Sequence, residues 1–511
     1  MKHSAFIKKA LPVAIAAVAV ILVVIAIVGR SDNTPERITL VIEEGVVELA
    51  PSLYAERDDI VGVVLPSTLV TIGAEAFRGC TFLESVTVPA GVKTIDSRAF
   101  RDCTSLKTVV LEGTPDTLGE GIFAACPRLE SVSFAEGTSA VGDAMFEGCS
   151  SLSEIVLPES LTSIGAGAFK DCKILSKVGF GAKLSEIGAD AFYGCRNLTE
   201  LTLGEGITVI GENAFRECVA LTEAHLPSSL MKIGDHAFQD CVAIKSVKLD
   251  AVSELGDHIF RGCDEIEIAE VGSFIASQDG SVRFPAYSAR TIVVKEGVTE
   301  LGVRAFADCQ KLQTVTLPES LTAIHKSAFH GCVSLEAIRL PKALTYIGSY
   351  AFAGCRKITS VTIPDTVTRM DAAAFSDCEG LESVTLSKSL TKLDMQVFSA
   401  CGSLKEITLP EGLSEIGAAS FRRCASLKTI VLPDSVEVIG ERAFDSCAAL
   451  ESVALSKSVE RIGAQVFYAC DVLEIVTYPG TSAAWSLVKK ADDWQADHPT
   501  LTFICQGDPA S

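Results

Sequence analysis

A repeat of 23 residues is the feature that most constrains how this chain can fold. Cys recurs at this interval from Cys80 to Cys241 and again from Cys309 to Cys470. Each of these cysteines, and also Cys263 between the two runs, follows a Phe by three positions and precedes a Leu or Ile by three. Chance cannot hold 17 units in register, so the sequence predicts an array of stacked structural repeats.

The unit reads C-x-x-L-x-x-V-x-L-P-x-x-L-x-x-I-G-x-x-A-F-x-x, which predicts one coil per repeat. The stretch L-x-x-V-x-L is typical of a short strand whose alternate side chains face inward. Pro ends this strand because it has no N–H for the ladder, Gly suits the turn that follows, and Ala-Phe packs inward. We therefore predict a mainly β repeat solenoid, a curved stack of coils with short strands and turns.

Stacking places each recurring side chain above its counterpart, which predicts interior columns of Phe and of Cys. We interpret the cysteines as buried reduced thiols that fill space. Disulfides between coils are an alternative, because coils about 4.8 Å apart lie within the Cα separation that a disulfide tolerates. A zinc site is disfavoured, because thiols in a line do not converge on a metal. Representative core residues are Phe77, Cys80, Phe169, Cys172, Phe215, Cys218, Phe352, Cys355, Phe444 and Cys447.

The repeat also defines the organisation of the rest of the chain. Its register continues upstream of the first Cys, with Tyr54 in the Phe position and Arg57 in the Cys position. It breaks once, where we expect a degenerate coil with a hairpin-like insertion around Asp279-Gly280. The predicted segments are a short cytoplasmic tail (1–9), a transmembrane signal anchor (10–29), a first array (34–263), a degenerate repeat with an insertion (264–308), a second array (309–478) and a C-terminal cap (479–511).

The amino-terminal residues predict export of the whole array. Residues 10–29 carry no charge over 20 positions, which is long enough for one helix to cross a bilayer. Lys2, Lys8 and Lys9 precede this run, which places the N-terminus in the cytoplasm and the array outside. A cleaved signal peptide is the alternative, although its apolar region is usually only about 7–15 residues long. We predict a single-pass, membrane-anchored protein at the cell surface, and a cleaved, secreted protein is the alternative.

Charge and motifs exclude several functions. The chain has 44 Lys and Arg against 65 Asp and Glu, a net charge of −21, so nucleic acid is not an expected partner. The sequence lacks G-x-S-x-G, a Walker loop and H-E-x-x-H, so we predict neither an enzyme nor a cofactor. Asp235-His236 and Asp257-His258 stack in the predicted register, but other coils hold unrelated residues there. We therefore predict no metal site.

The 23-residue unit resembles the BspA-like leucine-rich repeat family over residues 34–480. It departs from the commoner leucine-rich repeat pattern, because Leu takes the Asn/Cys position and Cys follows Ala-Phe instead. The segment around Trp485 is similar to the terminal segment of such proteins. The resemblance implies a leucine-rich repeat stack and adhesion to host or neighbouring cells through surface or matrix proteins.

The outward positions of the strands are the candidate ligand face, because curved solenoids bind ligands on their concave surface. The middle coils vary most there, and no aromatic residue occupies the outward column seven positions after Cys, which favours a protein ligand over a carbohydrate. We hypothesise recognition or adhesion through this face; a structural spacer or envelope protein without a ligand and a carbohydrate-binding protein are the alternatives. The candidate residues are Thr202, Glu223, His225, Lys245, Lys248, Glu270, Glu336 and Arg339.

Overall fold

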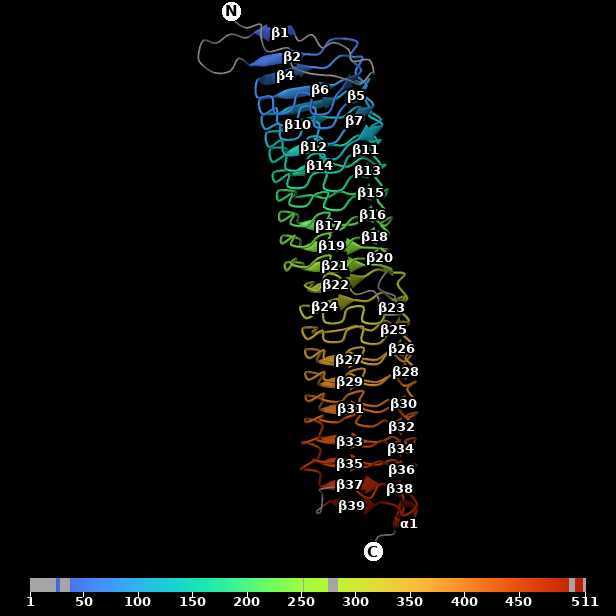
Figure 1. The fold of residues 1–511 in the computed structure, drawn as a ribbon. Coiled ribbons are helices and arrows are strands. Elements are labelled where there is room, and N and C mark those ends of the chain that lie inside the picture. Colours follow the sequence, from blue (N-terminus) through green and yellow to red (C-terminus); the bar gives the residue numbers. More distant parts are fainter. Residues whose placement is uncertain (1–23, 28–36, 251, 274–283, 496–500, 509–511) are drawn as a thin grey trace, which may run out of the picture. The chain divides into compact units, whose positions relative to one another are not determined.

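The computed structural model describes residues 24–27, 37–250, 252–273, 284–495 and 501–508. It divides into two compact units, unit 1 (residues 1–175) and unit 2 (residues 176–511). Within each unit, short strands recur at two places in most coils and stack in ladders that are almost entirely parallel (Figure 1). The predicted mainly β repeat solenoid is therefore confirmed.

Unit 1 contains two sets of strands, which we call the first and the second ladder. Most strands of the first ladder come from the L-x-x-V-x-L stretch of a repeat, and most strands of the second consist of two residues that end at the position before Gly. The first ladder consists of β1 (Val24–Ile27), β2 (Ile38–Val41), β4 (Ile60–Val64), β6 (Ser85–Val88), β8 (Thr108–Leu111), β10 (Ser131–Ser133) and β12 (Glu154–Val156). The second consists of β3 (Glu48–Leu49), β5 (Thr71–Ile72), β7 (Thr94–Ile95), β9 (Thr117–Leu118), β11 (Ala140–Val141) and β13 (Ser163–Ile164).

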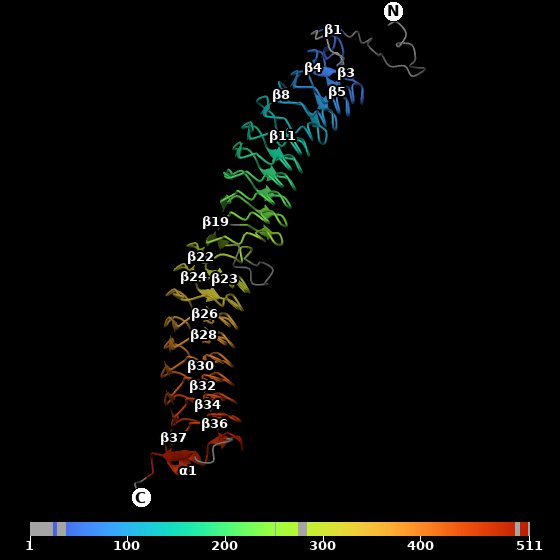
Figure 2. The ribbon, with the colours of Figure 1, turned by 90° about the vertical axis from the view of Figure 1, so that its left-hand side faces the viewer.

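Unit 2 repeats both ladders along a longer stack, which Figure 2 shows from a second side. Its first ladder consists of β14 (Lys177–Gly179), β17 (Glu223–His225), β19 (Ser246–Leu249), β21 (Ile268–Val271), β22 (Thr291–Val294), β24 (Thr314–Thr316), β27 (Ser360–Thr362), β29 (Ser383–Thr385), β31 (Glu406–Thr408), β33 (Thr429–Val431), β35 (Ser452–Ala454), β37 (Ile475–Tyr478) and β39 (Thr502–Cys505). Its second ladder consists of β15 (Glu186–Ile187), β16 (Val209–Ile210), β18 (Lys232–Ile233), β20 (Glu254–Leu255), β23 (Glu300–Leu301), β25 (Ala323–Ile324), β26 (Tyr346–Ile347), β28 (Arg369–Met370), β30 (Lys392–Leu393), β32 (Glu415–Ile416), β34 (Val438–Ile439), β36 (Arg461–Ile462) and β38 (Lys489–Lys490).

The second ladder differs from the sequence prediction, which gave one strand per coil and assigned Gly to a turn. Gly440 follows β34, and a Cβ at this position would lie 2.4 Å from the backbone N of Ala418 in the preceding coil. Arg442, two residues later, adopts the left-handed conformation instead, with φ of 54°. The recurring Gly is thus required by close approach of two coils rather than by its freedom in a turn.

The interior is built from the predicted columns. Every representative Phe and Cys of the predicted core has 0% exposure. Successive Phe rings stack with centroid distances from 4.9 Å, between Phe352 and Phe375, to 5.9 Å, between Phe375 and Phe398. Upstream of the first Cys, Tyr54 stacks on Phe77 at 5.2 Å, as its place in the repeat predicts. Repetition of one large flat side chain therefore produces a continuous core within each unit.

The predicted transmembrane helix falls mainly outside the described residues, which include only Val24–Ile27 of it. These four residues form β1, which pairs antiparallel with β2, so the structure differs here from the predicted helix. Val and Ile favour strands, and the free edge of β2 offers hydrogen bonds. In the part of the chain that the structure describes, no helix has the length and apolar character of a membrane span.

The interruption at 264–308 keeps the first ladder intact. Strand β22 pairs in parallel with both β21 and β24, so it occupies the ordinary place of a coil. Phe284 lies 5.5 Å from Phe306 with the rings nearly perpendicular, and buried Ala286 stands where other coils have Cys. The predicted hairpin-like insertion around Asp279-Gly280 lies outside the described residues.

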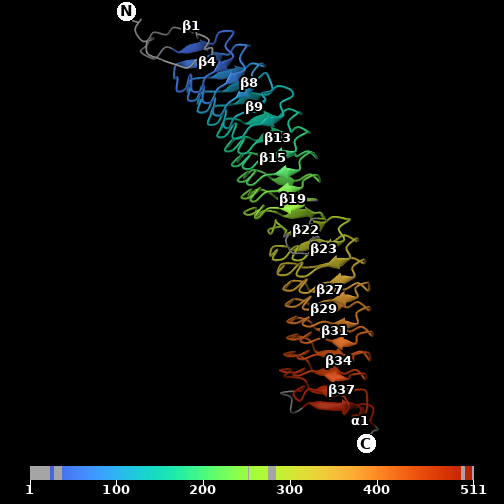
Figure 3. The ribbon, with the colours of Figure 1, turned by 45° about the vertical axis from the view of Figure 1, so that its right-hand side comes forward.

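The carboxyl-terminal segment carries the one α-helix of the described residues, α1 (Ser482–Trp485), beyond β37 at the end of unit 2 (Figure 3). Trp494 packs edge-on against Phe467 at 6.1 Å, beside the last Phe ring of the column. Trp485 in turn contacts Phe503 of β39 at 4.3 Å. Because aromatic side chains cover the last coil, we keep the terminal cap as our prediction for this segment.

Candidate ligand face

Two coils in the described part of unit 2 contribute no regular strand to the first ladder, and strand pairing also stops between β31 and β33. Residues 199–203 form no strand, although they lie between β14 and β17. Residues 337–340, between β24 and β27, contribute only an isolated bridge from Ala337 to Thr314. A groove opens in the strand face at each of these two coils. The apolar positions of the strand stretch stay apolar at both places, and Gly204, which takes the Pro position of the unit, is not itself a signal because other coils with a strand also lack this Pro.

The first of these, which we call the His225 groove, has a volume of about 470 Å³ and is lined by Thr199–Leu203 and by residues of β17. It brings together three predicted residues, Thr202, Glu223 and His225. The Nδ1 atom of His225 lies 3.6 Å from the Glu223 carboxylate, and its Nε2 atom lies 3.2 Å from Ser246 Oγ. All three predicted side chains are exposed and polar, which suits hydrogen bonding to a ligand.

Strand register aligns further predicted residues beside this groove. His225 of β17 pairs with Lys248 of β19, and Lys248 pairs with Glu270 of β21. The three outward side chains therefore form one row across adjacent strands, spaced by about 4.8 Å. Lys245 is exposed one residue before β19, next to this row.

Arg339 lies away from this row. Glu270 pairs with Val293 and Val293 pairs with Thr316, so two strands separate Glu270 from the coil of Arg339. Glu336 is also exposed on that coil, and its carboxylate lies 4.0 Å from the Lys357 ammonium. The predicted residues thus divide between two places on the strand face.

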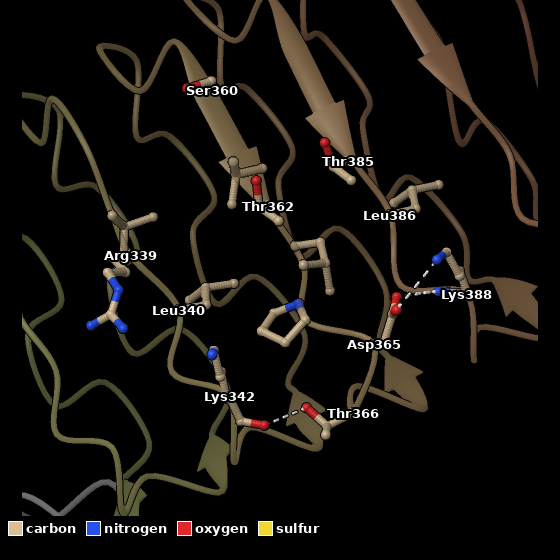
Figure 4. A pocket seen from close by; sticks show the side chains of 14 residues that line it. Arg339, Leu340, Lys342, Ser360, Thr362, Asp365, Thr366, Thr385, Leu386 and Lys388 are labelled. Carbon is tan, nitrogen blue, oxygen red and sulfur yellow. Dashed lines mark hydrogen bonds and ion pairs between the residues drawn. The ribbon is translucent and has the colours of Figure 1, made fainter.

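The second groove, which we call the Arg339 groove, has a volume of about 790 Å³ (Figure 4). Residues 338–342 form one side, strands β27 and β29 contribute Thr362 and Thr385, and the turns after the strands contribute Asp365 and Lys388. Lys342, Asp365 and Lys388 were not among the predicted residues, because they follow the strand and the prediction considered only strand positions.

Charged side chains around the Arg339 groove form ion pairs at the surface. The Arg339 guanidinium lies 2.7 Å from the Glu319 carboxylate and, with the backbone N–H of Lys342, lowers the pKa of Glu319. On the other side, Asp365 accepts a hydrogen bond of 3.0 Å from the Lys388 backbone N–H and lies 3.7 Å from its ammonium. The groove therefore has charged groups at both sides.

The neighbouring histidines are a further place where a metal site was considered. The rings of His236 and His258 stack at 5.5 Å, as the register predicts, but the described residues contain no group of three or more His, Cys, Asp or Glu that could hold a metal.

The thiols are structural. In both units, most repeat Cys thiols donate to the backbone carbonyl of the Phe in the preceding coil, as in Cys378 to Phe352 at 3.2 Å, and Cys80 donates to that of Tyr54. Burial raises the pKa of Cys378 to about 12, so the thiol is neutral at physiological pH. The predicted burial of the repeat cysteines agrees with the structure, in which all 17 are buried, and their reduced state stays a prediction. Their role as hydrogen-bond donors was missed, because the repeat pattern shows spacing but not hydrogen bonds.

Parallel short strands with a recurring Leu or Ile interior define a leucine-rich repeat solenoid. The family model described as BspA type Leucine rich repeat region (6 copies) matches residues 47–160, 139–267, 280–403 and 372–485. These matches cover most of the sequence, so the chain belongs to the BspA-type leucine-rich repeat family. The resemblance predicted from the 23-residue unit is confirmed.

Several solved structures are similar to this chain. A leucine-rich repeat protein from Bacteroides ovatus is 26% identical over 72% of this chain and 87% of that chain, with a TM-score of 0.48. A leucine rich cell surface protein from Faecalibacterium prausnitzii is 25% identical over 66% and 90%, with a TM-score of 0.34. The leucine rich repeat protein of T. pallidum is 28% identical over 40% and 77%, with a TM-score of 0.26. No curated protein matches this chain in a sequence comparison.

Proposed function

We propose that this chain is a membrane-anchored cell-surface protein that recognises an extracellular protein through the strand face of unit 2 and thereby serves adhesion. The observation that carries this proposal is the pair of grooves at the two coils that lack a regular strand of the first ladder. Regular coils present a uniform row of outward side chains, whereas a groove buries more of a ligand surface. Leucine-rich repeat proteins typically act as non-enzymatic scaffolds that bind proteins, which agrees with this proposal.

The lining of the grooves supports a protein ligand. Among the described residues, neither groove is lined by Phe, Tyr or Trp, the side chains on which sugar rings commonly stack. The location at the cell surface rests on the uncharged segment 10–29 and the lysines before it, which predict a signal anchor.

The proposal is tested by binding of the full chain to an array of extracellular proteins and glycans at physiological salt. Two variants separate the two grooves: His225→Ala with Lys248→Ala, and Arg339→Ala alone. We expect a saturable protein ligand whose Kd rises at least about fivefold in one of these variants, as expected for a contact at the centre of an interface.

The control variant is Lys232→Ala with Lys392→Ala, which removes two exposed cations from the second ladder. Its binding should match that of the unchanged chain. A glycan ligand would replace our proposal with carbohydrate binding, and binding to neither class would favour a structural spacer.

A further inference from the structure

The Arg339 groove combines an apolar floor with a cationic rim. Leu340, Ile363 and Leu386 form the floor and are 7%, 1% and 6% exposed. Arg339 and Lys342 come from the coil on one side, whereas Lys388 comes from the other side (Figure 4). One coil lies between these sides, so they are two strand spacings apart, a distance of about 10 Å.

The rim cations are accessible to a ligand. The side chains of Arg339 and Lys388 are 74% and 86% exposed. Their ion pairs with Glu319 and Asp365 are at the surface, where such pairs are weak, so a ligand carboxylate can replace either acid. Lys342 adds a third cation to the rim, and its charge also helps to lower the pKa of Glu319.

The local charge is opposite to that of the whole molecule. Three cations and one acid line the groove, and the Glu319 carboxylate pairs with Arg339 at its edge, which leaves an excess of one positive charge, whereas the chain as a whole carries a net charge of −21. A ligand with negative charge is therefore attracted to this groove and repelled by most other surfaces. Charge alone thus selects an anionic ligand and its place of binding.

We propose that the Arg339 groove binds an acidic, extended peptide segment of the protein ligand, with an apolar side chain on the floor and carboxylates at the rim. This inference rests on the proposed function and assigns the chemistry of the segment that is recognised. Carboxylates two to four positions apart span about 7–13 Å in an extended peptide, which matches the separation of the rim cations. The apolar floor favours a peptide over an anionic polysaccharide, which offers no side chain to fill it.

The test measures binding of the full chain to short labelled peptides by fluorescence anisotropy. One peptide alternates Glu and Leu, a second replaces every Glu with Gln, and a third replaces every Glu with Lys. A sulfated oligosaccharide serves as competitor. The groove variant combines Arg339→Ala, Lys342→Ala and Lys388→Ala.

The matched control combines Lys392→Ala, Lys405→Ala and Lys457→Ala, which removes the same charge from exposed sites of unit 2 outside the groove. We expect the Glu peptide to bind more tightly than both other peptides, and more weakly as salt rises. Loss of three exposed ionic contacts should weaken its binding about tenfold in the groove variant. The control variant should bind as the unchanged chain does.

Four results would overturn the inference. Equal weakening in both variants would show an effect of net charge alone. Binding of the Gln peptide as tight as that of the Glu peptide would show that the groove does not recognise carboxylates. Displacement by the sulfated oligosaccharide, with loss of its own binding in the groove variant, would assign the groove to an anionic glycan. Binding of no peptide, together with an array ligand that is unaffected by the groove variant, would reject this inference and leave the proposed function intact.

Discussion

At the scale of single residues, the Cys thiol of a repeat links its coil to the preceding coil by a hydrogen bond. Cys378 donates to the carbonyl of Phe352, and that carbonyl also accepts the backbone N–H of Cys355 at 3.2 Å. Cys is small and apolar enough to fill the interior space here, and its weak S–H donor uses the second lone pair of the Phe352 carbonyl oxygen. Ala would fill less volume, and Ser would replace the sulfur with a smaller, more polar group.

Replacement of Cys378 by Ala should destabilise its coil by about 1–2 kcal/mol, through loss of one hydrogen bond and creation of a small cavity. The measurement is hydrogen exchange of the backbone amides in the two adjoining coils. The control is Thr385→Ala, an exposed substitution that should change stability by less than about 0.5 kcal/mol. Equal protection in the two variants would contradict the role that we assign to the thiol.

At the scale of elements, the second ladder depends on the Gly that follows most of its strands. Gly440 follows β34, and its missing side chain allows the backbone of residues 417–418 to approach closely. Because each coil contacts only its neighbours, a disturbance here acts on two adjoining coils.

The substitution Gly440→Ala should therefore cost about 1–3 kcal/mol, the usual effect of forcing an extra methyl group into a packed site. Gly402→Ala is the matched control, since a Cβ there has no atom within 4 Å. Denaturant titration of both variants checks the prediction. If the Gly440 variant were as stable as the control, the close approach of the coils would not be a constraint.

At the scale of the whole molecule, the buried Cys column should lower the free energy of unfolding as the pH becomes alkaline. Burial raises the pKa of Cys80 to about 11 and that of Cys172, Cys332 and Cys424 to about 12. The unfolded chain releases these protons near pH 8.5, the ordinary value for a thiol. The stability due to the neutral thiols is thus complete below about pH 8.5 and is lost as the pH rises toward 12.

We expect the free energy of unfolding to fall above about pH 9, by up to about 1.4 kcal/mol per pH unit for each thiol in a cooperatively unfolding segment. Denaturant titrations between pH 8 and pH 11 measure this slope. The Cys378→Ala variant should show a shallower slope, because one titrating thiol is removed. Identical slopes would mean that the thiols do not cause the alkaline loss of stability.

The sequence by itself determined the class of fold, the register of the coils and the buried columns. Each coil has the same interior positions to fill, so Phe and Cys recur at a fixed spacing and each repeat predicts the same fold again. Even Tyr54, which replaces Phe, was placed correctly, because the pattern around it is unchanged.

Only the tertiary structure decided where the strand face is interrupted. The coils of Thr202 and Arg339 keep the apolar positions of the repeat, yet neither forms a regular strand of the first ladder. Pairing between strands depends on how two backbones meet, which the side-chain pattern of one coil does not encode. For the same reason, the cationic rim around Lys342 and Lys388 emerged only when turns from different coils were brought together across the groove.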